Sequence, residues 1–127
     1  MDKRISENKY LIENKLINSI EYIVETPSLV SLSYDDFISV IGNKERLYHY
    51  SDIIHFYDLA AVKLKCDFKL SDMIIYIESG DTVTLKEVNK LLHYVKASLG
   101  DDITILYSIK INSKIKRGEA KLFILAS

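Results

Sequence analysis

Cysteine, proline and glycine are scarce in this chain of 127 residues, and each shortage excludes a class of structure. Its one cysteine, Cys66, cannot form an internal disulfide and has no cysteine or histidine partner at metal-binding spacing, which fits a reducing cytoplasm. The four glycines stand alone at positions 42, 80, 100 and 118, so a glycine-rich phosphate-binding loop is absent. With one proline and no low-complexity run there is no linker, so residues 1–127 are predicted to form a single domain.

Long apolar runs and an excess of basic charge are missing as well. Although 48% of the residues are hydrophobic, no run approaches the about 18 apolar residues of a membrane span. The formal net charge of -1 gives no global basic excess to hold a nucleic acid. The N-terminus is charged from its second residue and lacks an uninterrupted apolar segment, so a secretory signal is not expected. These features predict a globular, cytoplasmic protein that binds neither membranes nor nucleic acids.

The best-specified part of the sequence begins at residue 73 and predicts a strand followed by a tight turn. Residues 73–77 are a short apolar run rich in isoleucine, long enough for a buried strand and too short for a helix. Ser79, Gly80 and Asp81 have turn chemistry and end the strand. Glu78 beside them could bind an ion, but a turn is the simpler explanation of this sequence.

A helix with its own start and stop residues comes next, at 85–99. Thr84 can cap the N–H groups of the first turn, and Glu87, three residues later, completes a capping box. Gly100 is placed to end the helix. An apolar stripe at helical spacing runs down one face and consists of Leu85, Val88, Leu92, Val95 and Leu99, with Leu91 alongside.

The N-terminal part predicts a long helix and then a short one. Apolar residues recur at helical spacing across residues 1–27, and the proline at the end stops the helix, because the residue before a proline avoids helical geometry. Residues 28–45 are predicted as a loop and a short helix, with Ser33 and Asp36 as its N-terminal cap. A capping role also explains Asp35, since a helix start favours negative charge.

Residues 46–127 are predicted to form an α+β sandwich. Weak alternation predicts a strand at 46–50, and a helix is expected over residues 52–65. Segments 103–111 and 120–126 are rich in Ile and Leu and flank a polar turn, which predicts a terminal antiparallel hairpin. The predicted fold is a four-stranded mixed sheet with two helices packed on one face, preceded by the long N-terminal helix.

No catalytic or metal-binding set assembles from these residues. The three histidines lie in different predicted elements, so we expect surface or core-edge roles for His49, His55 and His93. A basic cluster around the last hairpin could meet an acidic partner, although lysines also protect exposed sheet edges. This cluster consists of Lys110, Lys114, Lys116 and Arg117. We therefore predict no enzyme activity, no metal and no cofactor.

Several motifs, taken in order, resemble the C-terminal half of FtsZ, the bacterial tubulin homologue that polymerises into the division ring. The sequence MIIYIESGDTVTLKEVN resembles the family's V-L-I-N-I-T-G-G-x-x-L-x-L-x-E-V-N, with Ser79 in place of the first glycine of the pair. The ending LFILAS resembles V-T-V-I-A-T, and Pro27 with Leu29 falls on the family's P-G-L. The resemblance begins near Leu11, runs to Ser127, and implies the tubulin-type C-terminal domain fold.

The resemblance also implies an interaction site just after P-G-L. In the family, a loop of the form N-x-D-F-x-D reaches into the nucleotide pocket of the next subunit and completes its GTPase site. The residues here are Ser31, Ser33 and Asp36, with Tyr34 at the aromatic position, and serine cannot polarise water as a carboxylate does. We expect this degenerate loop to bind protein without catalysis, through Leu29, Ser31, Ser33, Tyr34, Asp35, Asp36 and Phe37.

Because the resemblance leaves out the family's nucleotide-binding half, our leading hypothesis is a non-catalytic interaction module. It would act on or within a tubulin-like cell-division filament, with FtsZ or another tubulin-like protein as partner, and cap or modulate its assembly. Two alternatives stay open: the separated C-terminal half of a divergent FtsZ-like GTPase, and a small-molecule-binding α+β domain unrelated to division. A buried pocket with convergent charged residues would favour the latter.

A homodimer is a further expectation from the resemblance. In the family, part of the surface around the N-terminal helix packs on the nucleotide-binding half. Apolar residues there would lack a partner in this chain, and an uncovered apolar patch tends to be buried by self-association. The expected self-association face consists of Leu11, Ile12, Ile20 and Tyr22.

Overall fold

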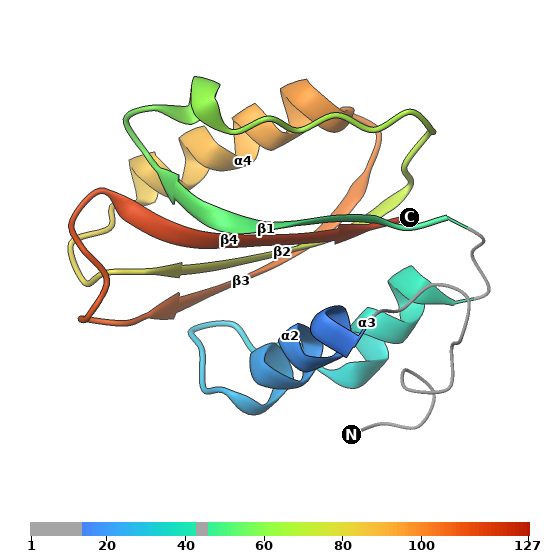
Figure 1. Cartoon of the computed structure of the whole chain (residues 1–127), viewed down its shortest axis with the longest axis horizontal. Coiled ribbons are helices and arrows are strands. Elements are labelled where there is room, and N and C mark those ends of the chain that lie inside the picture. Colours follow the sequence, from blue (N-terminus) through green and yellow to red (C-terminus); the bar gives the residue numbers. More distant parts are fainter. Residues whose placement is uncertain (1–13, 43–45) are drawn as a thin grey trace.

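The computed structural model describes residues 14–42 and 46–127, in which one sheet lies between two helical layers (Figure 1). Its elements are α2 (Asn14–Glu25), α3 (Tyr34–Ile41), β1 (Tyr48–His55), the 3-10 turn η1 (Leu59–Ala61), β2 (Asp72–Ser79), α4 (Leu85–Leu99), β3 (Thr104–Ile111) and β4 (Glu119–Ala126). The strand order is β1-β4-β2-β3, with β4 antiparallel to both neighbours and β3 parallel to β2. The predicted α+β class and the four-stranded mixed sheet are confirmed.

The two central strands are β2 and β4, because their side chains are buried on both faces. Every residue of β2 after Asp72 is buried, and so is β4 from Leu122 to Ala126. A strand covered on both sides is a nearly continuous apolar run in sequence, as both of these are. The edge strands β1 and β3 keep several exposed side chains, so each is suited to one covered face only.

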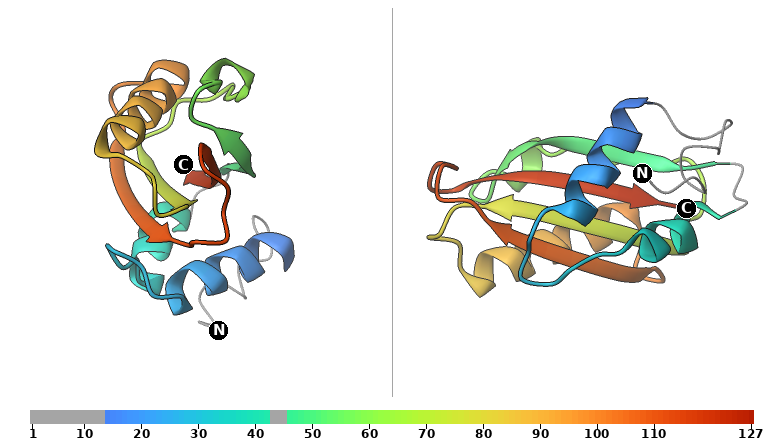
Figure 2. Two further views of the ribbon diagram at one scale, coloured as in Figure 1. Left: turned by 90° about the vertical axis from the view of Figure 1, so that its left-hand side faces the viewer. Right: turned by 90° about the horizontal axis from the view of Figure 1, so that it is seen from below.

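Helices lie on both faces of the sheet (Figure 2), and each face carries its own hydrophobic core. On one face α4 packs on β2 and β4, with Leu91, Val95 and Ile75 fully buried. On the other face α2 and α3 pack on the same strands, with Ile20 and Phe37 fully buried. Within the described part of the chain, none of the helices is long and apolar enough to cross a membrane.

The structure confirms α4 and its caps as the sequence predicted them. The Thr84 hydroxyl accepts a hydrogen bond from the Glu87 N–H at 3.1 Å, and the Glu87 carboxylate accepts one from the Thr84 N–H at 2.9 Å. The buried residues of its inner face are Val88, Leu91 and Val95. Leu85 does not join this stripe and is 74% exposed, because it lies at the first turn, beyond the sheet contact.

The predicted terminal hairpin is wrong. β3 and β4 are consecutive in sequence but are separated by β2, which pairs with both. β4 carries the more continuous apolar run and takes a central place, whereas β3 exposes Leu106 and Tyr107 and takes an edge. The polar connection between them therefore crosses from the edge of the sheet to its centre.

The helix predicted for residues 52–65 is also wrong. The first part of this segment continues β1 to His55, where it pairs with β4, and only the 3-10 turn Leu59–Ala61 comes after it. Phe56, Leu59, Val62 and Leu64 are buried against the α4 face without forming a helix. α4 therefore shares its face with η1 rather than with a second long helix, and the other two helices, α2 and α3, lie on the opposite face (Figure 2).

Candidate functional site

The loop between α2 and α3 runs along the outer edge of β3 and is tied to it (Figure 1). The Leu29 N–H donates a hydrogen bond to the Ile109 carbonyl at 2.8 Å. The hydroxyl of Ser108, which is buried in β3, donates to the Val30 carbonyl. These two bonds hold the loop in place at the point where the resemblance implied an interaction site.

The apolar side chains of this loop are exposed although its backbone is held. Leu29 is 70% exposed and Val30 is 52% exposed, and Ser31 beside them is also exposed. A loop that is already ordered loses little conformational entropy when it binds. Exposed apolar side chains on such a loop are suited to contact another protein.

The polar residues of the predicted site are engaged at the start of α3. The Ser33 N–H donates to the Asp36 carboxylate at 2.8 Å, and the Asp36 N–H donates to the Ser33 hydroxyl at 3.2 Å. Asp35 is exposed in the first turn, where its charge suits the helix dipole. The Tyr34 hydroxyl donates to Glu25 at 3.2 Å and links α3 to the end of α2.

Phe37 cannot be part of a docking surface, which corrects one residue of the predicted site. Its side chain is fully buried, and its ring meets Phe123 of β4 edge-on with the ring centroids 6.3 Å apart. The residues of the predicted site that remain exposed are Leu29, Ser31, Ser33 and Asp35, while Tyr34 and Asp36 are half-buried. Val30 is an exposed member that the sequence prediction omitted.

The predicted self-association face is only partly within the described residues. Leu11 and Ile12 lie outside them. Ile20, expected to be uncovered, is fully buried between α2 and the sheet. Tyr22 is 47% exposed, but its hydroxyl is used within the chain, because it donates to Glu78 at 2.8 Å.

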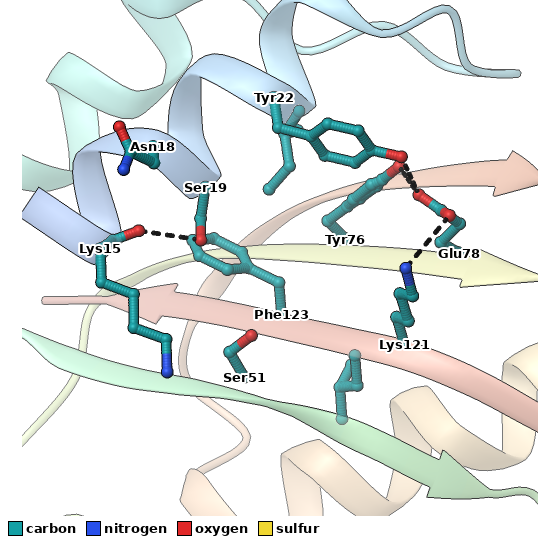
Figure 3. Close-up of a pocket in the computed structure, with 11 residues that line it drawn as sticks. Lys15, Asn18, Ser19, Tyr22, Ser51, Tyr76, Glu78, Lys121 and Phe123 are labelled. Carbon is teal, nitrogen blue, oxygen red and sulfur yellow. Dashed lines mark hydrogen bonds and ion pairs between the residues drawn. The ribbon is translucent and has the colours of Figure 1, made fainter.

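Glu78 is the centre of a buried polar network that joins α2 to the sheet (Figure 3). Its side chain is 1% exposed, and one carboxylate oxygen accepts hydrogen bonds from the hydroxyls of Tyr22 and Tyr76, each at 2.8 Å. The other oxygen accepts from the Asn112 amide at 3.0 Å and lies 3.9 Å from the Lys121 ammonium. A buried charge is tolerated when it is paired and hydrogen-bonded in this way.

The network shifts the pKa values of Glu78 and Tyr76 in opposite directions. Burial by itself would raise the pKa of Glu78, but hydrogen bonds from Asn112, Tyr76 and Tyr22, together with the Lys121 charge, outweigh it and hold the pKa below its ordinary value. Burial and the neighbouring carboxylate raise the pKa of Tyr76 well above its ordinary value. Glu78 is therefore ionised and Tyr76 is neutral near neutral pH.

This network forms one end of a pocket of about 420 Å³ between α2 and the sheet (Figure 3). Side chains from one helix and three strands line it, namely Lys15, Asn18, Ser19, Tyr22 and Ile23 of α2, Ser51 of β1, Tyr76 and Glu78 of β2, and Lys121, Leu122 and Phe123 of β4. Sequence analysis placed Glu78 in a turn and missed this site. The alternation of Ile74, Tyr76 and Glu78 along a strand would have placed all three on one face of the sheet.

The basic cluster at the β3–β4 connection divides between two environments. The Lys110 ammonium donates to the Tyr22 hydroxyl at 3.4 Å and lies 5.3 Å from the centre of its ring, so it belongs to the edge of the Glu78 network. The other three cations, Lys114, Lys116 and Arg117, are exposed in the connecting segment.

The histidines lie apart from one another. His49 packs beside the Phe123 ring and His55 beside the Tyr57 ring, with centroid distances of 5.2 and 5.3 Å, while His93 is exposed on α4. Across residues 14–42 and 46–127 there is no group of three or more His, Cys, Asp or Glu residues that could hold a metal ion.

Solved structures with the same arrangement of strands and helices are known. A structure of an FtsZ dimer from M. jannaschii superposes with a TM-score of 0.63 over 88% of this chain, at 15% sequence identity. The chain has an FtsZ-like fold. A point mutant of FtsZ from M. jannaschii gives a TM-score of 0.60 over 98% of this chain, at 12% identity.

The likeness to FtsZ is structural and covers part of the FtsZ chain. This protein spans 36% and 44% of the length of the two FtsZ chains it matches. No protein-family model matches the sequence, and no curated protein matches it. The α+β fold of the predicted C-terminal domain is thus shown.

Proposed function

We propose that this chain is a non-catalytic interaction module that binds a subunit of a tubulin-like filament through the loop between α2 and α3. The FtsZ-like fold supports the choice of partner, since one of the matched structures is that of an FtsZ dimer. The observation that carries the proposal is the loop itself. Its backbone is bonded to β3, and it exposes Leu29 and Val30.

The chemistry of the loop supports binding without turnover. Ser33 stands where the resembled family has a carboxylate, and its hydroxyl is occupied by the cap of α3. Asp36 accepts the Ser33 N–H and hydroxyl and is likewise engaged by its own helix. The Ser33 hydroxyl is used in this cap, and a serine in place of a carboxylate lacks the charge that polarises a water molecule for attack on a phosphate.

The proposed effect on a filament follows from geometry. A subunit that adds to a growing end through one face, without offering the second face, stops further addition at that end. We therefore expect this module to shorten filaments at concentrations well below that of the filament protein.

The test uses FtsZ from the same cell and measures filament length, sedimented polymer and phosphate release with increasing amounts of this protein. We expect shortened filaments with the wild-type chain. Leu29→Ala should weaken the effect about tenfold, because truncating a central apolar contact costs about 1–3 kcal/mol of binding. Ile53→Ala is the matched control, since Ile53 is 59% exposed but lies on β1 at the opposite edge of the sheet.

Two outcomes would contradict the proposal. One is unchanged polymer mass, turnover and filament length at an excess of the wild-type chain. The other is an equal loss of effect in the Leu29→Ala and Ile53→Ala variants, which would place the contact elsewhere.

A separated half of an FtsZ-like GTPase is the second candidate, and the coverage of less than half of each FtsZ chain favours it. In that case the chain should form a stable one-to-one complex with a protein that carries a GTPase domain, and GTP turnover should require both. Co-purification from the native cytoplasm, followed by phosphate release assays on the separate and combined components, distinguishes this candidate from a capping module.

A further inference from the structure

We propose that the pocket between α2 and the sheet binds an organic anion that has an aromatic or similarly flat apolar body. This inference does not depend on the proposed docking function. The cavity of about 420 Å³ is within the range of small-molecule sites, which are typically about 300–1,000 Å³. It also combines apolar walls with a few convergent polar groups, as such sites do.

The apolar surface of the pocket is provided by Phe123 and Ile23. Phe123 is 5% exposed, and its ring contacts the rings of Phe37 and His49. Ile23 is buried on α2 and faces the same space. A fixed ring of this kind favours a flat apolar ligand, because ring-to-ring contacts add to the gain from burial.

The carboxylate of Glu78 argues against a cationic ligand. A carboxylate has about four acceptor positions, and here two hydroxyls, one amide and one ammonium are directed at them. Hydrogen bonds from Tyr22, Tyr76 and Asn112 fill three of these positions, and the Lys121 ammonium 3.9 Å away balances the charge. A ligand cation would have to displace one of these partners and would also meet the ammonium groups nearby.

Lys121 is the group best placed to bind an anion. Its ammonium is 3.9 Å from Glu78, beyond hydrogen-bond distance, and its side chain is 60% exposed. An ammonium has three donors, so Lys121 can turn to a ligand while keeping its electrostatic attraction to Glu78. Exposed Lys15 lines the pocket from α2 and Lys110 lies at its edge, which leaves an excess of positive charge over the single carboxylate.

Small polar groups complete the rim. Asn18 and Ser19 of α2 line one side and Ser51 of β1 lines the other (Figure 3). The Ser19 hydroxyl donates to the Lys15 carbonyl at 3.1 Å, so its proton is used within α2. Ser51 is exposed on the edge strand, where a larger side chain would project into the space without disturbing the core.

The test compares three probes that share one ring system. They are 2-naphthoate, the neutral 2-naphthamide and the cationic 2-naphthylmethylammonium, each titrated into the full chain and followed by amide chemical shifts and calorimetry. We expect 2-naphthoate to bind about tenfold more tightly than the amide, as one additional charge-assisted hydrogen bond allows, and the ammonium to bind most weakly. The shifts should centre on Ser51, Tyr76 and Phe123.

Two variants locate the site, and one serves as a control. Lys121→Met should weaken 2-naphthoate about tenfold while leaving the amide unchanged, because it removes the charge and keeps the apolar stem. Ser51→Phe should abolish binding of both 2-naphthoate and 2-naphthamide by filling the cavity, and its amide spectrum tests whether the variant is folded. Lys116→Met removes an exposed lysine outside the pocket and should leave all affinities unchanged.

Three results would overturn the inference. The first is equal affinity for the anion and the amide. The second is an effect of Lys121→Met no larger than that of Lys116→Met. The third is a set of shifts that maps outside the pocket. None of these results bears on filament docking, so this inference and the proposed function can fail separately.

Discussion

At the scale of single residues, Glu78 is the least expected feature of this protein. A buried carboxylate near the end of a central strand costs free energy unless it is paired, and here four groups from four parts of the chain provide the pairing. The hydrogen bond from Tyr22 joins α2 to the sheet. The hydrogen bond from Asn112 joins the segment after β3 to the end of β2. Glu78 therefore links elements that are distant in sequence.

Glu78 should make the stability of the protein depend on pH in the acid range. Its pKa in the folded chain is below the ordinary value of 4.5, so the unfolded chain binds the proton more readily. The stabilisation is therefore fully present above pH 4.5 and is lost as the pH falls through the folded-state pKa. In Glu78→Gln this part of the pH dependence should disappear, and the free energy of unfolding near pH 7 should fall by about 1–3 kcal/mol.

Urea unfolding measured from pH 7 down to pH 3 checks this expectation. Glu119→Gln is the matched control, because it removes the same charge at a half-buried position on β4. If Glu78→Gln and Glu119→Gln shift the pH profile equally, the buried network does not hold the pKa of Glu78 down.

Gly80 is required by close packing rather than by its backbone angle. A Cβ atom built at this position would lie 2.7 Å from the Ile115 carbonyl oxygen, a backbone atom that cannot move aside cheaply. Gly80→Ala should lower the free energy of unfolding by about 1–3 kcal/mol, the usual cost of overpacking. Thermal or urea unfolding measures this loss of stability, and Asp81→Ala at the exposed neighbouring residue is the control. A variant as stable as the wild-type chain would show that the connecting segment can shift.

At the scale of elements, α3 and α4 have the same type of N-terminal cap. α3 and α4 each begin with a capping box, Ser33 with Asp36 and Thr84 with Glu87. The helices that these boxes begin differ in length and position. α4 has 15 residues and packs on the sheet through Val88, Leu91 and Val95, whereas α3 has 8 residues and begins directly after the proposed docking loop.

Loss of either cap should destabilise the chain by a similar amount. Ser33→Ala and Thr84→Ala are each expected to lower the free energy of unfolding by about 1 kcal/mol, because the N–H of Asp36 or of Glu87 loses its hydroxyl acceptor. Amide hydrogen exchange should show a difference between the two. Faster exchange should reach back into the docking loop only in Ser33→Ala. Faster exchange in the loop of the Thr84→Ala variant would contradict this local account.

At the scale of the whole molecule, the described fold is a two-faced sheet with no glycine-rich loop in its sequence. The two FtsZ chains that it matches are more than twice as long, so the likeness applies to the fold of one part of them. The role of the chain must then depend on the surfaces that this part presents. The α2–α3 loop and the pocket under α2 are the two surfaces with a physical argument for binding.

The purified chain should neither bind nor hydrolyse GTP. A triphosphate needs a cradle of backbone N–H groups, which glycine-rich loops provide and this sequence does not contain. Titration calorimetry with GTP and Mg²⁺ tests for binding, and a phosphate release assay tests for hydrolysis. Micromolar affinity for GTP would remove the basis of the non-catalytic proposal.

The sequence by itself determined the elements that depend on neighbouring residues. The start, inner face and end of α4 follow from Thr84, the apolar spacing and Gly100, all within one segment. The cap of α3 and the buried run of β2 are equally local. The longest motif that resembles FtsZ spans β2 and the start of α4, which is why the fold class could be predicted.

Only the tertiary structure decided where strands and buried polar groups find their partners. Residues 52–55 were predicted to begin a helix, but pairing with β4 makes them the end of strand β1. β4 pairs with β2 rather than with its sequence neighbour β3, because a run that is apolar on both faces gains most at the centre of the sheet. Glu78 can remain charged inside the protein because Tyr22, 56 residues earlier, and Asn112, 34 residues later, are brought to it by folding.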